Sequence, residues 1–273
     1  MWTLHPARVF YGVLAALAVM LSPVEAKAQD AVDVELILAV DVSLSMSPGE
    51  MEIQRRGYAA ALTHETVIQA IESGLNGRIA IAYFEWAGDA TQRLVVPWTT
   101  IASAEDAARV AEMLMVNPPR SARRTSISGA INFAADLFVE SGYRSMRRVL
   151  DISGDGPNNQ GAPVVQARDD LVAAGVTVNG LPLMTNEGFS TSYDIRDLDR
   201  YYSGCVIGGP GAFMIPVNEW SQFPEAVRRK LVIELAGTED PEAPVVLAQA
   251  SDDFDCMIGE RMWQERLWMW DEQ

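Results

Sequence analysis

The stretch Glu35-Leu-Ile-Leu-Ala-Val-Asp-Val-Ser-Leu-Ser45 decides the fold of this chain. Residues 36–40 are apolar on both faces and rich in strand formers, which predicts a buried strand of a parallel sheet. Asp41, Ser43 and Ser45 follow at alternate positions, where the chain leaves that strand. Open α/β sheets bind ligands at this edge, and a carboxylate with two hydroxyls suits Mg²⁺ rather than Zn²⁺. The alternative is a strand-to-helix turn in which a serine caps the helix.

Two later segments offer further oxygen ligands. Arg148-Val-Leu-Asp-Ile-Ser-Gly-Asp-Gly156 is a second short apolar run, and it places Asp155 at another strand end. Between the two runs, Thr125 comes just before a segment with helical apolar spacing. Thr125 or Ser126 caps that helix, or Thr125 presents its hydroxyl to a cation. Three loops therefore offer one set of candidate metal ligands, namely Asp41, Ser43, Ser45, Thr125 and Asp155.

The pattern Asp-x-Ser-x-Ser, then Thr, then Asp resembles the metal-ion-dependent adhesion site of the von Willebrand factor type A (vWA) family. The resemblance covers residues 33–236 and implies a Rossmann-like fold that binds Mg²⁺, with Mn²⁺ or Ca²⁺ possible, through these five residues. It also implies that an acidic side chain of a partner protein completes the coordination. The runs Tyr83-Phe-Glu-Trp-Ala-Gly88 and Ser153-Gly-Asp-Gly-Pro-Asn-Asn159 are similar to a bacterial secreted subfamily of unknown function.

One position departs from the family pattern. The family commonly has Gly between the two serines, whereas this chain has Leu44. Glycine permits a positive φ that a branched side chain resists. We therefore expect a loop that differs in detail, or a Leu44 side chain that contacts a partner.

The N-terminus has the pattern of a secretory signal peptide. Arg8 precedes the apolar residues 9–21, and Ala26-Lys-Ala28 supplies the cleavage pattern, so residues 1–28 are predicted to be removed. The alternative, an uncleaved membrane anchor, needs about 20 apolar residues. No later stretch is long and apolar enough to span a membrane. The mature protein is therefore expected to be exported, to the periplasm or the extracellular space.

Charge and residue counts exclude several classes of function. The formal net charge is −16, and it becomes −17 without residues 1–28, which hold two basic residues and one acidic residue. This charge disfavours nucleic acid and anionic lipid as partners. Beyond residue 28 the only histidine is His64, so a Ser-His-Asp set and the usual zinc sites are not expected. Cys205 and Cys256 form an even pair that predicts one disulfide in an oxidising compartment, with two free buried thiols as the alternative.

Strand and helix patterns alternate through most of the chain, which predicts a doubly wound, mostly parallel sheet with an antiparallel edge strand. Past residue 236, an acidic Pro-containing linker leads to a Trp-rich tail that ends at residue 273. Trp263, Leu267 and Trp270 are spaced to share one helix face. That face packs on the parent domain or docks another protein. The predicted strands are residues 78–86, 93–98, 147–152, 175–183 and 212–217, and the predicted helices are 48–71, 104–115, 126–141, 162–174, 193–202 and 219–235.

Together with the resemblance to the vWA family, the sequence predicts a secreted, non-enzymatic protein-binding module, and the resemblance implies that its metal captures an acidic side chain of a partner. The first alternative is a metal-assisted hydrolase of phosphoesters or similar substrates, because Asp41 and Asp155 are expected to lie close together. Haloacid-type phosphatases pair two carboxylates in this way, but they need a second Asp where this chain has Ser43. The second alternative is a purely structural envelope protein.

Overall fold

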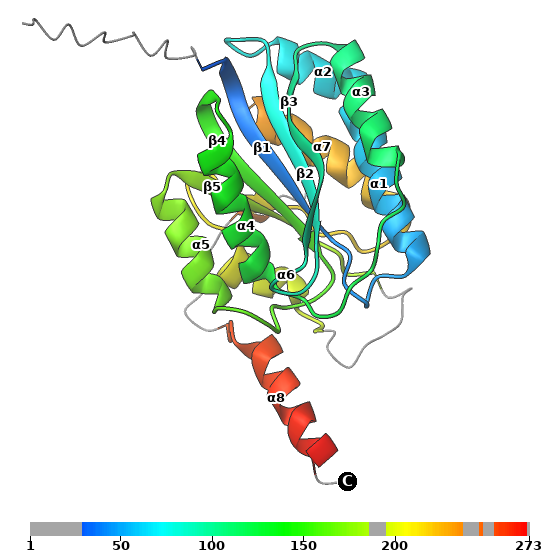
Figure 1. Cartoon of the computed structure of the whole chain (residues 1–273), viewed down its shortest axis with the longest axis vertical. Helices are drawn as coiled ribbons and strands as arrows, with labels where there is room; N and C mark the ends of the chain where they lie inside the picture. Colours follow the sequence, from blue (N-terminus) through cyan, green and yellow to red (C-terminus); the bar gives the residue numbers. More distant parts are fainter. Residues whose placement is uncertain (1–28, 186–194, 237–245, 248–253, 272–273) are drawn as a thin grey trace, which may run out of the picture.

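The computed structural model describes residues 29–185, 195–236, 246–247 and 254–271. Within these residues one seven-stranded sheet has the order β3-β2-β1-β4-β5-β6-β7 (Figure 1). β1, β2, β4, β5 and β6 run parallel, whereas β3 and β7 are antiparallel to their neighbours at the two edges. The predicted doubly wound, mostly parallel sheet is therefore confirmed. The strands are β1 (Ala31–Asp41), β2 (Ile79–Trp86), β3 (Gln92–Ile101), β4 (Arg144–Gly154), β5 (Val176–Pro182), β6 (Phe213–Met214) and β7 (Val246–Leu247).

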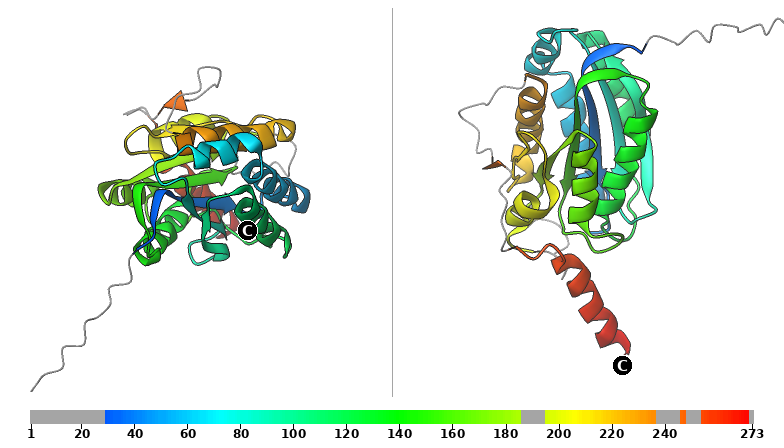
Figure 2. Two further views of the ribbon diagram at one scale, coloured as in Figure 1. Left: turned by 90° about the horizontal axis from the view of Figure 1, so that it is seen from above. Right: turned by 90° about the vertical axis from the view of Figure 1, so that its left-hand side faces the viewer.

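Helices cover both faces of the sheet, and β1 shows why (Figure 2). Its side chains alternate, so Leu36 and Leu38 join one core cluster while Ile37 and Ala39 join the other. Both faces of this strand are consequently buried. The first cluster lies under α1 (Pro48–Leu62), α2 (Glu65–Glu72), α3 (Ala104–Met115) and α7 (Phe223–Ala236), and the second lies under α4 (Ile127–Glu140), α5 (Val164–Ala173) and α6 (Leu198–Tyr201).

Several predicted elements differ in extent from the structure. Among the described residues, the helix predicted over residues 193–202 is reduced to α6, which a π-helical turn follows. The helix predicted over residues 48–71 is split into α1 and α2, because Thr63 donates its hydroxyl to the carbonyls of Ala59 and Ala60 where α1 ends. His64 then caps α2, and its Nδ1 accepts the backbone N–H of Thr66 at 3.2 Å. The strand predicted over residues 212–217 is reduced to β6.

The interior holds a cluster of charged side chains between β4 and α7. Lys230 lies 2.8 Å from Asp151 Oδ1 and also donates to Glu234, and all three side chains are at most 2 % exposed. Burial raises the pKa of Asp151 to about 7, although the charge of Lys230 opposes this shift. Burial alone lowers the pKa of Lys230, but the charges of Asp151 and Glu234 raise it above its ordinary value.

Asn179 on β5 extends this buried cluster. Its Nδ2 donates to Glu234 Oε1 at 2.8 Å, while its Oδ1 accepts the backbone N–H of Phe213 at 3.0 Å. The two carboxylates therefore share one lysine, and Glu234 also accepts a hydrogen bond from an amide. Burying these charges costs free energy, and their pairing offsets that cost.

The C-terminal segment is joined to the domain by a disulfide between Cys205 and Cys256, as predicted from the cysteine count. Cys205 lies in a π-helical turn, Tyr202–Val206, that continues α6. The tail then forms α8 (Ile258–Asp271), which projects from the end of the molecule where the parallel strands end (Figures 1 and 2). The predicted signal peptide, residues 1–28, and the side chains of Leu267 and Trp270 lie outside the described residues. Among the described helices, none has the length and apolarity that a membrane crossing requires.

Candidate metal centre

The sheet order brings the two candidate aspartates to one place. The chain runs from β1 through β2 to the edge strand β3, and then returns to β4 on the other side of β1. The carboxyl ends of β1 and β4 therefore lie side by side at the point where the strand order reverses, which is where open α/β sheets bind ligands. Asp41 is the last residue of β1, and Asp155 comes directly after the last residue of β4.

Four of the five candidate side chains form a connected set of hydrogen bonds. Asp41 Oδ1 accepts the backbone N–H of Ser43 at 2.7 Å, which turns the loop sharply after the strand. The hydroxyls of Ser43 and Ser45 are 2.9 Å apart. Ser45 donates its hydroxyl to Asp155 Oδ1 at 2.7 Å. The structure thus brings together carboxylate and hydroxyl oxygens from the first loop, which follows β1, and from the third loop, which follows β4.

Thr125, the fifth candidate, lies on the second loop beside these two. The backbone of this loop pairs with the first loop, because Ala122 forms a parallel bridge with Ser43. Thr125 also exchanges two hydrogen bonds with Asn159: its N–H donates to Asn159 Oδ1 at 3.0 Å, and its carbonyl accepts the N–H of Asn159 at 2.8 Å. Thr125 is therefore fixed against the loop that carries Asp155.

The structure decides which residue caps the helix after the second loop. Ser126 accepts the backbone N–H of Gly129 at 3.1 Å and is the N-cap of α4. Of the two capping residues considered from the sequence, Ser126 takes the role, and Thr125 is not needed for it.

The electrostatics of Asp41 favour a bound cation. Asp41 is fully buried, and its Oδ2 has no hydrogen-bond partner among the residues that the structure describes. Burial raises the pKa of Asp41 well above its ordinary value, the negative charge of Asp155 raises it further, and hydrogen bonds from Ser43 offset only part of this. A buried carboxylate beside a second one is unfavourable without a compensating positive charge. All the candidate ligand atoms are oxygens, so the residues fit a hard divalent cation.

Two residues of the site were missed by the sequence reasoning. Gln54 on α1 is buried and donates to the backbone carbonyl of Asp41 at 3.1 Å, while its Oε1 accepts the hydroxyl of Ser153 at 3.4 Å. A Cβ on Gly154 would lie 2.9 Å from Asp41 Oδ2, so only glycine fits there without a shift. The Gly-Asp-Gly run in the sequence could have indicated that Gly154 belongs to the site. A glutamine inside a helix has no sequence pattern that would have indicated Gln54.

The departure at Leu44 has no backbone consequence. Among the described residues, Arg124 is the non-glycine residue with a positive φ, so the loop does not need glycine between the two serines. The Leu44 side chain is 57 % exposed. No group of three or more His, Cys, Asp or Glu side chains in the described part of the chain is arranged to hold a metal, so the candidate centre depends on two carboxylates with hydroxyls.

Solved structures with this fold come from distant proteins. Proximal thread matrix protein 1 from the mussel byssus has a TM-score of 0.51 and 19% identity, over 76% of this chain and 49% of that chain. A von Willebrand factor type A structure from Catenulispora acidiphila has a TM-score of 0.54 and 12% identity, over 77% and 44%. The pilus adhesin SpaC from Lactobacillus rhamnosus GG has a TM-score of 0.54 and 11% identity, over 76% and 31%. The chain thus spans about half or less of the length of these proteins.

The sheet order and these likenesses define the class: the chain has the vWA fold. A family model described as "Protein of unknown function (DUF1194)" matches residues 31–239, and the chain belongs to that family. The predicted resemblance to vWA domains and to a bacterial family of unknown function is confirmed. A search of the curated proteins found no match.

Proposed function

We propose that this chain is an exported, non-enzymatic protein-binding module that uses a metal-ion-dependent adhesion site. Asp41, Ser43, Ser45, Thr125 and Asp155 would hold Mg²⁺, with Mn²⁺ or Ca²⁺ as alternatives, and an acidic side chain of a partner protein would complete the site. One observation carries the proposal. Asp41 Oδ2 is buried and has no hydrogen-bond partner within the described part of the chain, and Asp41 belongs to a connected set of carboxylate and hydroxyl groups at the switch point of the sheet.

Each residue has a chemical reason for its part. Asp41 and Asp155 supply two negative charges, which match the charge of a divalent cation. Ser43, Ser45 and Thr125 supply neutral oxygens, so they add ligands without adding repulsion. When bound, Mg²⁺ offers a coordination position to a carboxylate of the partner. Because Gln54 and Asn159 hold the loops by side-chain hydrogen bonds, the ligands are placed before the cation arrives.

Two solved structures support a binding role by analogy. One structure of the mussel byssus matrix protein is described as having a zinc-occupied MIDAS motif, so this kind of site holds metal on this fold. SpaC is a pilus adhesin. For this chain, the all-oxygen donor set favours Mg²⁺ over Zn²⁺. The single histidine of the predicted mature chain, His64, caps a helix, which supports a binding module over acid–base catalysis.

The first test is calorimetric titration of the metal-stripped protein, beginning at Gln29, with Mg²⁺. We expect one saturable site that is lost in Asp155→Ala and kept in Asp170→Ala, whose aspartate is exposed on α5. The control removes the same charge from the surface, so it separates ligand loss from a change in net charge. Identical isotherms for the wild type and Asp155→Ala would rule out the site.

Partner capture gives the second test. A pull-down with the mature protein as bait should retain a partner in Mg²⁺ and release it on chelation. The same partner should be absent with Asp155→Ala and present with Asp170→Ala. Capture that is indifferent to chelation would show that binding does not use the metal.

A further inference from the structure

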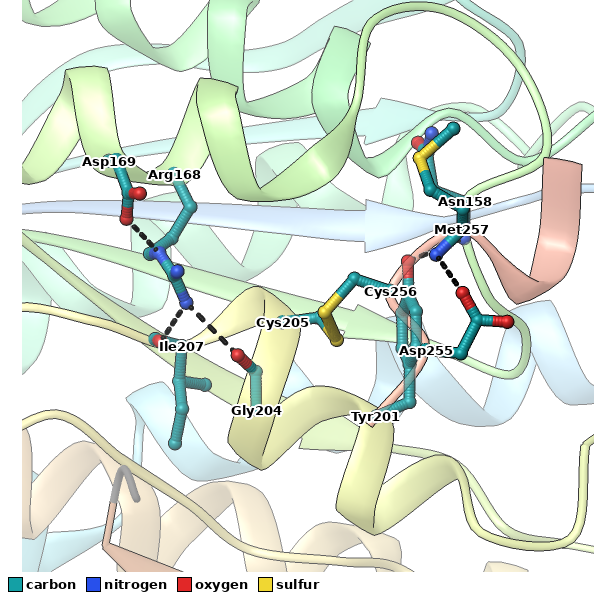
Figure 3. The surroundings of a disulfide bond; sticks show 10 residues. All are labelled: Asn158, Arg168, Asp169, Tyr201, Gly204, Cys205, Ile207, Asp255, Cys256 and Met257. Atoms are coloured by element: carbon teal, nitrogen blue, oxygen red, sulfur yellow. Dashed lines mark hydrogen bonds and ion pairs between the residues drawn. A yellow bond between two sulfur atoms is a disulfide. The ribbon is translucent and has the colours of Figure 1, made fainter. Parts of the chain in front are cut away.

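The C-terminal segment returns to the loops of the candidate metal centre. Two residues before the disulfide-bonded Cys256, the ring of Phe254 lies edge-on to Tyr201, with centroids 6.0 Å apart. The hydroxyl of Tyr201 accepts the backbone N–H of Asn158 at 3.1 Å (Figure 3). The disulfide therefore anchors the segment beside the third loop of the site, three residues beyond Asp155.

The first turn of α8 is seated directly on that third loop. Glu260 Oε1 accepts a hydrogen bond from Asn158 Nδ2 at 2.7 Å. A Cβ on Gly259 would lie 2.1 Å from the carbonyl oxygen of Asn158, so the helix approaches the loop as closely as only glycine permits. Asn158 in turn accepts the backbone N–H of Ser128 through its Oδ1 at 3.0 Å. One asparagine thus links the tail, the third loop and α4.

The second turn of α8 reaches the second loop. The guanidinium carbon of Arg124 lies 3.2 Å from the centroid of the Trp263 indole, in a cation–π contact. Arg124 has a φ of 77°, a conformation that costs free energy for any residue except glycine. Arg124 comes directly before Thr125 in the chain. The tail therefore contacts the side chain of the residue that directly precedes Thr125.

We propose that residues 254–263 form a disulfide-anchored clamp that positions the Thr125 and Asp155 loops of the metal centre. Glu260 and Trp263 are positioning residues of the clamp: they act on Thr125 and Asp155 through Asn158 and Arg124. The proposal rests on the proposed metal site. It adds that the geometry of this site is completed by a segment outside the sheet and its covering helices, held in place by a covalent bond.

The clamp is expected to matter because ordering the two ligand loops costs conformational entropy. Metal ligands on loops must lose conformational freedom before they can bind. A disulfide keeps the tail close to the loops, so the contacts of Glu260 and Trp263 form at little further entropic cost. Groups that orient metal ligands commonly change metal affinity 10–100-fold when they are removed.

The first half of the test needs no metal. Hydrogen exchange of the metal-free full chain should show about tenfold faster exchange at residues 124–128 and 156–159 in Glu260→Ala and Trp263→Ala. Trp263→Phe keeps an aromatic face and should restore protection. Gln264→Ala, on an exposed position of the same helix, should leave both loops unchanged. Unchanged exchange in Trp263→Ala and Glu260→Ala would overturn the proposal.

The second half is a Mg²⁺ titration of the same variants and of Cys205→Ser/Cys256→Ser. We expect affinity to fall at least tenfold in Glu260→Ala, Trp263→Ala and the double serine variant, and to stay constant in Gln264→Ala. Faster exchange with unchanged affinity would overturn the positioning role. If the wild type binds no Mg²⁺ while exchange still responds, the metal site fails and the clamp on the loops stands. The single tail variants keep the test valid if the double serine variant does not fold.

Discussion

Two aspartates four positions apart, Asp151 on strand β4 and Asp155 directly after it, have different surroundings in the structure. Asp151 is enclosed in the core, where Lys230 lies 2.8 Å from its Oδ1. Asp155, just past the end of the strand, is partly exposed and accepts a hydrogen bond from Ser45. In both places a second carboxylate is close: Glu234 beside Asp151, and Asp41 beside Asp155.

The difference lies in the source of the positive charge. In the core, the chain supplies its own cation, Lys230, and the cluster is a closed structural unit. At the edge of the sheet, the charge of Asp155 adds to burial in raising the pKa of Asp41. On our proposal, a divalent cation from solution does at the edge what Lys230 does in the core. On the same proposal, the interior charge pair serves folding and the edge pair serves binding.

The largest expected effect on the free energy of unfolding comes from the interior cluster of Asp151, Lys230 and Glu234. Lys230→Met keeps most of the side-chain volume but leaves Asp151 and Glu234 without their cation. Breaking a buried ion pair on one side costs about 3–5 kcal/mol. Urea unfolding should show a loss of this size, whereas Arg56→Ala, which removes an exposed helix pair with Glu52, should cost less than about 1 kcal/mol. Equal losses in the two variants would remove the distinction between interior and surface.

The pH dependence of stability should also come from the interior. The pKa of Asp151 is about 7 in the folded protein, against about 3.9 for an ordinary aspartate. Between about pH 4 and pH 7 the folded state thus holds one proton more than the unfolded state. The free energy of unfolding should therefore fall as pH rises through this window, by up to about 1.4 kcal/mol per unit.

Asp151→Asn isolates the contribution of Asp151 to this pH dependence, because the wild type and the variant have all other titrating groups in common. Urea midpoints at about pH 4.5, 5.5, 6.5 and 7.5 give the slope for each protein. The wild type should lose stability relative to the variant as pH rises. The raised pKa of Lys230 adds stability that is lost only at more alkaline pH, outside this window. Parallel slopes would show that Asp151 does not carry the extra proton.

The edge site should respond to Mg²⁺ while the core does not. A ligand that binds only the folded state adds about 2.7 kcal/mol at a concentration of 100 times its dissociation constant. Thermal unfolding with and without Mg²⁺ should show this gain in the wild type and in Asp151→Asn, because Asp151 is not a ligand. Asp155→Ala should gain nothing. A gain that disappears in Asp151→Asn would show that the two regions are coupled through β4.

The smallest expected effect is at Leu44. The position does not have a positive φ, so Leu44→Gly relieves no strain and loses about 0.5–1 kcal/mol of stability through backbone entropy. Mg²⁺ affinity should stay within about threefold of the wild type, because the Leu44 side chain is exposed and its backbone conformation is unstrained. A tenfold gain in affinity would show instead that the leucine constrains the first loop.

The sequence was informative where the signal is local. The strand before Asp41 could be predicted because its apolar run is short and bounded, and α3 was predicted with its exact limits from helical spacing. Helix limits were less certain where a single side chain ends the helix: Thr63 divides the helix predicted over residues 48–71. The tail could be tied to the domain because two cysteines allow only one intramolecular pair.

The candidate ligands could be predicted from the sequence, but the residues that hold the ligand loops in place could not. The order Asp41, Ser43, Ser45, Thr125 and Asp155 matches a known pattern, and the structure brings four of these side chains into one hydrogen-bonded set. Gln54 and Glu260 were not identified as supports, because their partners are 13 and 102 positions away in the chain. A contact at such a separation leaves no periodic trace in the sequence.

The sequence by itself determined the strand, the alternate oxygen ligands that follow it and the doubly wound class, because these depend on neighbouring residues and on alternation. Only the tertiary structure decided that Asp151 meets Lys230 while Asp155 meets Ser45, although both aspartates belong to one short run. It also decided that α8 lies on Asn158 and Arg124. The physical reason is that charge pairing and burial depend on the order of strands and on the helices packed against them, and both are properties of the whole fold.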